Sequence, residues 1–270
     1  MTGRHRRPRR LSYERRRLIG GVSLSLFFAV VTLYTLNVAI AQVRGCSETV
    51  SLSVTVSPDL VDVVDDYDLN ERLVDSCISV ALHSSPSTEI SSTDTQVWIP
   101  ETILWTDHSG VTEGSWETYR ESVVSNPIGV AQGSIDIDRP RDAGVTDPAH
   151  DAADLLWLVT YGVDDDVVSA GDSESAPRVR TLSDVRRSGG DGLQRFSDAA
   201  VPTLSYPMLI DPQLNGPQRR AADDLSQVLS GTEFESTVRE RGYEPPEEHP
   251  PIYQDDVVDD VLEAWRSYRD

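Results

Sequence analysis

Lysine is absent from this 270-residue chain, so every fixed positive charge on a side chain belongs to an arginine. The arginines are unevenly placed. Residues 1–17 hold eight of them and one Glu, a net charge of +7, whereas the other 253 residues hold 16 Arg against 44 acids, a net charge of −28. A body this acidic repels nucleic acids and anionic membrane surfaces, and its sequence shows no basic patch. Binding to DNA or RNA is therefore disfavoured.

The motifs of common catalytic and nucleotide-binding sites are also missing. The chain has no GxxxxGK[ST], no GxGxxG after a strand, no HExxH and no GxSxG. Its five His are scattered, and two Cys alone cannot form a zinc site. Residues 66–70 resemble the start of a calcium loop but lack its Gly and final Glu, and the acidic run 164–166 is more typical of a solvated turn. We therefore expect a protein that is not an enzyme and that uses no metal or cofactor.

One long apolar segment lies near the N-terminus. Residues 18–41 are uncharged, and these 24 residues exceed the roughly 20 that span a bilayer as a helix. The basic residues 1–17 orient such a helix with its N-terminus in the cytoplasm and its body outside. This pattern predicts a single-pass cell-membrane protein with an extracellular body. Ala39-Ile40-Ala41 also fits a cleavage site, so a cleaved signal and a secreted body remain the alternative. A lipoprotein anchor at Cys46 fits less well, because Arg44 places a charge where a small neutral residue is needed.

The two cysteines, Cys46 and Cys77, both follow the apolar segment. An exported compartment permits disulfides, and an even pair suggests one bridge. Closing this loop would stabilise the fold by roughly 3 to 4 kcal/mol in the chain-entropy model. The alternative is a pair of free, buried thiols.

The segment after Cys46 alternates strand and helix patterns. Residues 49–57 alternate apolar and hydroxyl side chains, as in a strand. Ser57-Pro58-Asp59 then has the composition of a helix start, and that helix should run to Leu73. Residues 77–82 and 97–99 read as the next strands. Strand–helix–strand order of this kind predicts an α/β fold with a mostly parallel sheet.

Further elements follow with less regular spacing. We expect a strand within 123–131 that is interrupted at Ser125-Asn126-Pro127, and a strand at 204–210 whose internal Pro places it at an edge or a bulge. Apolar periodicity predicts helices over 149–161, 181–187, 217–229, 234–241 and 255–268.

The most informative stretch is Thr95–Trp105. A strand over 97–99 should stop at Pro100, which cannot donate a ladder hydrogen bond, and a helix should follow it. Helix N-termini and hydroxyls at the ends of parallel strands can hold a ligand's polar groups. The alternative is that the tryptophans are core residues and the hydroxyls are plain helix caps. The candidate ligand-binding residues are Ser57, Ser84, Ser85, Trp98, Ser125, Asn126 and Asp147.

These pieces together resemble a known family. VWIPETILW, Ser57-Pro58-Asp59 between two cysteines, SNPIGVA at 125–131, Asp147-Pro148 and Ser205-Tyr206-Pro207 are similar to bacterial cell-surface proteins that join a type II periplasmic-binding-protein-like domain to a von Willebrand factor A domain. The resemblance covers residues 46–243. We expect the A domain itself to be absent from this chain, since no DxSxS motif occurs in it.

The resemblance implies a two-lobed α/β domain with a ligand in the cleft between the lobes. Lobe I would comprise 46–128 and 205–243, and lobe II 129–204, followed by an acidic, Pro-rich tail and terminal helix at 244–270. The expected function is a membrane-anchored, non-enzymatic solute-binding protein for a small ligand. The alternatives are a structural or regulatory ectodomain that binds another protein, such as a separate A-domain chain, and an exported hydrolase, for which no triad or metal spacing is present.

Overall fold

The computed structural model describes residues 46, 49–90, 94–106, 116–132, 137–163, 176–194, 196, 201–254 and 256–269. Residues 49–270 form one compact unit, and of the preceding 48 residues only Cys46 is described. The predicted membrane segment 18–41 therefore lies outside the described residues. Among those that are described, no helix combines the length and the apolar character that crossing a bilayer requires.

A six-stranded sheet organises the described residues, in the order β2-β1-β3-β6-β4-β5. Its strands are β1 (Val50–Val56), β2 (Ile78–Ser84), β3 (Val97–Ile99), β4 (Glu117–Val130), β5 (Val179–Thr181) and β6 (Thr203–Ile210). Strand β1 pairs in parallel with β2 and β3, whereas the β3–β6, β6–β4 and β4–β5 pairs are antiparallel. The α/β class is confirmed. The expectation of a mostly parallel sheet was wrong. Strand β6 pairs antiparallel with both β3 and β4, and β4 pairs antiparallel with β5, so antiparallel pairs are in the majority.

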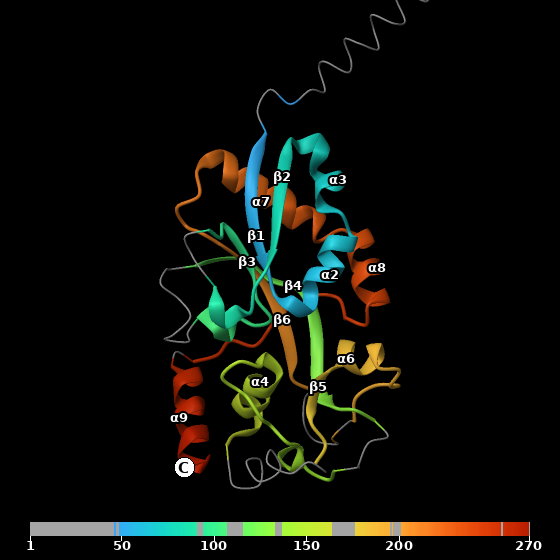
Figure 1. Cartoon of the computed structure of the whole chain (residues 1–270), viewed down its shortest axis with the longest axis vertical. Helices are drawn as coiled ribbons and strands as arrows, with labels where there is room; N and C mark the ends of the chain where they lie inside the picture. Colours follow the sequence, from blue (N-terminus) through green and yellow to red (C-terminus); the bar gives the residue numbers. More distant parts are fainter. Residues whose placement is uncertain are drawn as a thin grey trace, which may run out of the picture. The chain divides into compact units, whose positions relative to one another are not determined.

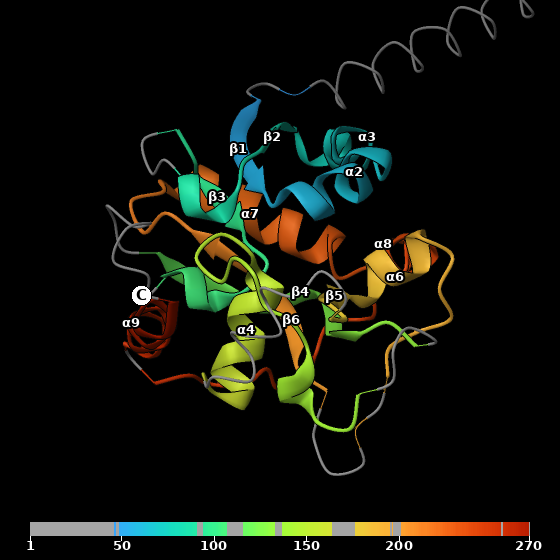
Figure 2. The same ribbon diagram turned by 60° about the horizontal axis from the view of Figure 1, so that its bottom comes forward.

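The two long strands β4 and β6 connect two groups of elements (Figure 1). We call β1–β3 with helices α2 (Pro58–Asp66), α3 (Leu69–Leu73), α7 (Gly216–Val228) and α8 (Thr232–Glu240) the first lobe. The second lobe consists of β5, α4 (Ala152–Tyr161), α6 (Leu182–Arg187) and α9 (Val257–Arg269). Figure 2 shows α4 and α9 on one side of the connecting strands and α6 on the other. The two-lobed arrangement thus follows from the path of the chain.

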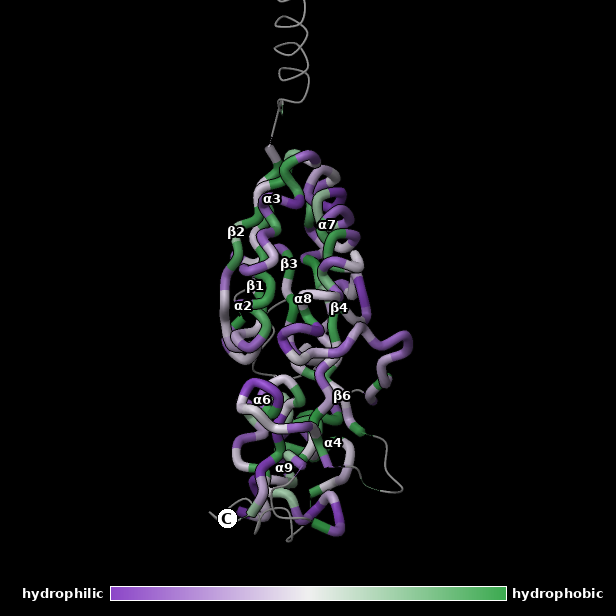
Figure 3. The backbone as a smooth tube through the Cα atoms, turned by 90° about the vertical axis from the view of Figure 1, so that its right-hand side faces the viewer, coloured by the Kyte–Doolittle hydropathy of each residue, from purple (hydrophilic) through white to green (hydrophobic). Residues whose placement is uncertain are grey.

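Hydrophobic residues from every strand form the core. Leu52, Val54 and Val56 of β1 are fully buried, and Tyr206, Leu209 and Ile210 of β6 are too. Figure 3 shows hydrophobic residues along the strands of the first lobe and hydrophilic residues on the outer side of α7. Ala221, Ala222 and Leu225 lie on one face of α7 and are buried, as the apolar spacing of 217–229 predicts.

Several predicted boundaries need correction. The helix after Ser57 ends at Asp66, because Asp68 adopts a left-handed backbone (φ 50°) and caps a separate α3. Instead of a helix after Pro100 there is one 3-10 turn, η3 (Ile103–Thr106). Strand β4 is continuous through Asn126, and the register shifts of the β4–β6 pair lie nearer its start. Helix α4 begins after Asp151, whose carboxylate accepts two backbone N–H groups, rather than at Asp147.

Other expectations hold. The helices predicted over 181–187, 217–229, 234–241 and 255–268 appear as α6, α7, α8 and α9. The internal Pro of β6 was expected at an edge or a bulge. Strand β6 lies inside the sheet, and Pro207 falls at a register shift of the β4–β6 pair, as expected for a bulge. Cys46 and Cys77 are both disulfide-bonded, which confirms the predicted bridge.

Candidate functional site

Side chains on the connecting strands face two different environments. Residues at alternate strand positions point to opposite faces of a sheet. Asn126 and Tyr206 face α2 and α6, with which they hydrogen-bond. Their neighbours Ser125 and Ser205, which pair across the two strands, face the segment 244–254 between α8 and α9. We call this segment the tail. The two faces carry two candidate sites.

The first site is a buried polar cluster between the lobes. The Tyr206 hydroxyl donates to the Asp59 carboxylate, and the Tyr243 hydroxyl donates to the Asp59 backbone carbonyl at 2.6 Å. The Asn126 side-chain amide donates to the Tyr206 hydroxyl at 3.4 Å and to the Ser183 Oγ at 2.9 Å. Its carbonyl oxygen accepts from the Ser183 backbone N–H at 3.1 Å. Hydrogen bonds therefore run from the start of α2, through the connecting strands, to α6.

Asn126, Ser183, Tyr206 and Tyr243 are buried in this cluster, and Asp59 and Glu101 beside them are partly buried. Burial raises the pKa of Asp59 above its ordinary value, and Asp184 adds to that rise, while the Tyr206 hydroxyl opposes it. Burial and the nearby Asp59 charge also raise the pKa of Glu101 to about 7. Ser57 Oγ and Asp59 Oδ1 are buried and have no hydrogen-bond partner of ordinary geometry among the described residues.

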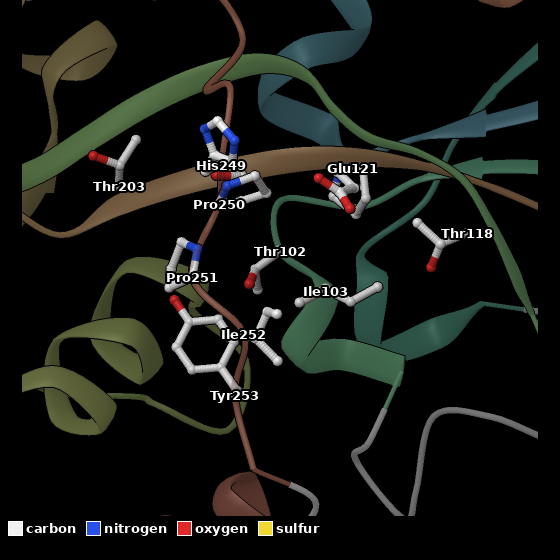
Figure 4. Close-up of a pocket in the computed structure, with 12 residues that line it drawn as sticks. Thr102, Ile103, Thr118, Glu121, Thr203, His249, Pro250, Pro251, Ile252 and Tyr253 are labelled. Atoms are coloured by element: carbon white, nitrogen blue, oxygen red, sulfur yellow. The ribbon is translucent and has the colours of Figure 1, made fainter.

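The second site is a cavity of about 420 Å³ on the opposite face. Figure 4 shows its wall assembled from η3, β4, β6 and the tail. A second hollow of about 590 Å³ shares Thr203, His249 and Tyr253 with it and reaches Val159 and Thr160 of α4. This space therefore extends from η3, which follows β3, to α4 of the second lobe. The cavity is lined by Thr102, Ile103, Thr118, Glu121, Thr203, Ser205, Pro207, His249, Pro250, Pro251, Ile252 and Tyr253.

The tail forms one wall of the cavity and is fixed to the strands. Ser125 and Glu244 exchange backbone hydrogen bonds of 3.0 and 2.8 Å. The Glu247 N–H donates to Ser125 Oγ at 2.9 Å, and its carboxylate accepts from Ser205 Oγ at 2.7 Å. Beyond the tail, α9 packs against α4. The tail therefore crosses from the first lobe to the second over the connecting strands.

The predicted site residues are divided among several places. Ser57 and Asn126 both belong to the buried cluster, and the Ser57 N–H donates to the Ile99 carbonyl at the end of β3, at 3.1 Å. Ser125 lies on the tail side. Trp98 is fully buried beside Trp116, with ring centroids 5.4 Å apart, and its Nε1 has no partner among the described residues.

The remaining three lie apart from both sites. Ser84 is exposed at the end of β2, and the Ser85 N–H donates to the Val56 carbonyl at 3.3 Å. Asp147 is exposed, contacts His150 at 2.9 Å and precedes α4. Neither cavity described above is lined by any of these three.

Sequence reasoning did not single out Asp59, Tyr206, Tyr243, Glu121 or the tail as parts of a site. A usable signal was the alternation of Ser205-Tyr206 and Ser125-Asn126, which places one polar residue of each pair on each face. Within the described residues, no group of three His, Cys, Asp or Glu side chains could hold a metal ion.

Solved structures of other proteins resemble the fold of this chain. A protein described as a lipoprotein from Actinomyces odontolyticus is 16% identical, and the match covers 73% of this chain and 99% of that one with a TM-score of 0.52. The two proteins share a fold. An ABC-type phosphate transport receptor from Vibrio cholerae matches at 12% identity, over 72% of this chain and 100% of its own, with a TM-score of 0.48.

A third match is described as the substrate-binding domain of a molybdenum ABC transporter from Clostridium difficile. It is 12% identical, over 74% of this chain and 100% of that one, with a TM-score of 0.48. No family model and no curated protein matches the chain. At these identities the likeness is one of fold. The predicted pairing with a von Willebrand factor A domain stays a prediction.

Proposed function

We propose that this chain is a non-enzymatic solute-binding protein that takes a small molecule into the cavity of Figure 4. The supporting observation is the position and size of that cavity. At about 420 Å³ it falls within the roughly 300–1,000 Å³ usual for small-molecule sites. It combines apolar walls with a few hydroxyl, carboxylate and imidazole groups, and it lies beside the strands that connect the lobes.

The ligand would then lie away from the ligand-binding residues that were predicted from the sequence. The side chains of the cluster around Asn126 are buried and hydrogen-bond to one another, so the cluster serves better as a connection between the lobes than as a ligand site. The cavity, by contrast, is bounded by the tail, whose bonds to Ser125 and Ser205 fix one wall. A ligand there would contact η3, the tail and the strands that join the lobes.

The test is a screen of the full chain in detergent against a library of neutral, cationic and anionic metabolites. Binding to the native state alone raises the melting temperature by mass action. Tryptophan fluorescence can follow melting, because Trp98, Trp105 and Trp157 are buried. We expect at least one compound to raise the melting temperature in a saturable way. A library without a single such compound contradicts the proposal.

We also propose that residues 18–41 anchor this domain to the cell membrane with residues 46–270 outside. The support is the sequence alone: an apolar run of 24 residues after an arginine-rich segment. Protease added to intact spheroplasts should digest the acidic body and leave a small protected N-terminal fragment. Soluble protein that begins at Gln42 would instead establish cleavage after Ala41.

A second candidate function is that of an ectodomain that binds another protein. The observation in its favour is the closed cluster, where Tyr206 and Tyr243 occupy the space between α2 and α6. Under this alternative the screen finds no ligand, while a partner protein raises the melting temperature.

A further inference from the structure

One carboxylate that lines the cavity has no side-chain partner among the described residues. Glu121 of β4 is exposed, and its side chain makes no hydrogen bond or ion pair with any residue that the structure describes. The other nearby carboxylate, Glu247, accepts a hydrogen bond from Ser205 Oγ at 2.7 Å. Arg120, next to Glu121 in the chain, donates instead to the Ser122 carbonyl and the Ser230 hydroxyl. Glu121 is therefore available to a ligand.

No arginine is found among the described residues that line either hollow. Among those described lining residues the basic group is His249, whose imidazole is neutral unless it is protonated. The whole chain has a net charge of −21 and contains no lysine that could reach in. The summed field of such a surface draws cations toward it and repels anions.

The rest of the wall is suited to an apolar body. Ile103 comes from η3 and Pro207 from β6, and Pro250, Pro251 and the Tyr253 ring come from the tail. Apolar walls with one charged group to fix orientation are the usual composition of a small-molecule site. An aromatic face can also attract a cation directly.

Resting on the proposed function, we propose that this cavity selects small organic cations: amines whose ammonium group pairs with Glu121 and whose apolar body lies against Ile103 and the tail prolines. Oxyanions are excluded by the same charges. The inference concerns the class of ligand, so it can fail while solute binding itself holds.

Three probes with one phenyl ring and one short side chain test the charge: phenethylamine, phenylacetamide and phenylacetate. Their binding to the full chain in detergent is measured by ligand-observed NMR at low and high salt, with inorganic phosphate as a further anion. We expect phenethylamine to bind most tightly, to bind more weakly at high salt, and to compete with any cationic compound from the library.

Glu121→Gln removes the charge and keeps the shape, and Glu71→Gln on α3 makes the same change of net charge away from the cavity. We expect Glu121→Gln to weaken phenethylamine binding about fivefold and to leave phenylacetamide binding unchanged, in keeping with a partly exposed ion pair. Glu71→Gln should change neither. Equal effects of the two variants on phenethylamine would overturn the assignment to Glu121.

The remaining outcomes separate the two proposals. If phenylacetate or phosphate binds as tightly as phenethylamine, or if the library yields only neutral and anionic ligands, the cation class is wrong although solute binding stands. If no probe and no library compound binds, both proposals fail together.

Discussion

The hydroxyl of Tyr206 donates a hydrogen bond to the carboxylate of Asp59, which lies 147 positions earlier in the sequence. Asp59 is in the first turn of α2, and Tyr206 lies on a strand that continues toward the second lobe. Through Asn126 the same chain of bonds reaches Ser183 of α6. A buried polar network of this kind holds the lobes in one arrangement as long as each member keeps its partner.

The first prediction concerns that bond. Tyr206→Phe removes the donor and leaves a buried carboxylate unsatisfied, which should lower the free energy of unfolding by about 1 to 3 kcal/mol. Asp59→Asn should cost less, because it removes a buried charge and keeps an acceptor for Tyr206. Denaturant unfolding of both single variants and the double variant measures their coupling. Additive effects would show that the bond contributes nothing.

The second prediction concerns Asn126, which the sequence proposed as a ligand contact. Its side chain makes three hydrogen bonds in a fully buried site, so Asn126→Ala should lower the melting temperature of the ligand-free protein. The expected loss is about 1 to 3 kcal/mol, since Ser183 and Tyr206 each lose a partner. Ser84→Ala, at an exposed strand end, is the matched control and should have little effect. Equal melting temperatures for the two variants would show that Asn126 is not structural.

Local patterns predicted local features well. Ser57-Pro58-Asp59 does begin a helix, and the apolar spacing of 217–229 does give α7, because caps and amphipathic faces depend on neighbours in sequence. Strand β4 was not predicted as continuous. Asn126 and Pro127 lower local strand propensity, but pairing of β4 with β6 and with Glu244 holds them extended.

Site residues were predicted less well for a related reason. The cavity exists because the tail returns to Ser125 and Ser205, residues that its Glu247 follows by 122 and 42 positions. No short pattern encodes such a return. The charge pattern of the sequence indicated an acidic body, but it could not show that Glu121 and the prolines of the tail line one cavity.

The third prediction is a pH dependence of stability. In the folded protein the pKa of Glu101 is raised to about 7, from an ordinary value of 4.5, so the folded state holds its proton more tightly than the unfolded state. This stabilising contribution is complete below pH 4.5 and is lost as the pH rises through about 7. Asp154, whose pKa burial raises to about 6, acts in the same direction. The free energy of unfolding should therefore fall between pH 4.5 and 7.

Glu101→Gln isolates one part of this effect. Because Glu101 keeps partial solvent exposure, its share should be about 1 to 3 kcal/mol at most. Urea unfolding across this pH range should show a shallower decline for Glu101→Gln than for the unsubstituted protein. An identical slope would mean that Glu101 titrates normally in the folded state.

The central claim, that a small molecule binds in the cavity beside β6, is tested most directly by blocking that cavity. Thr203 lines both hollows, so Thr203→Phe should fill the space that they share, whereas Ser84→Phe adds the same ring at the exposed end of β2. Calorimetric titration of both variants with a compound found by the library screen gives the answer. We predict that Ser84→Phe binds the compound like the unsubstituted protein and that Thr203→Phe loses binding at least tenfold while melting cooperatively. Equal affinity of the two variants would contradict the proposed site.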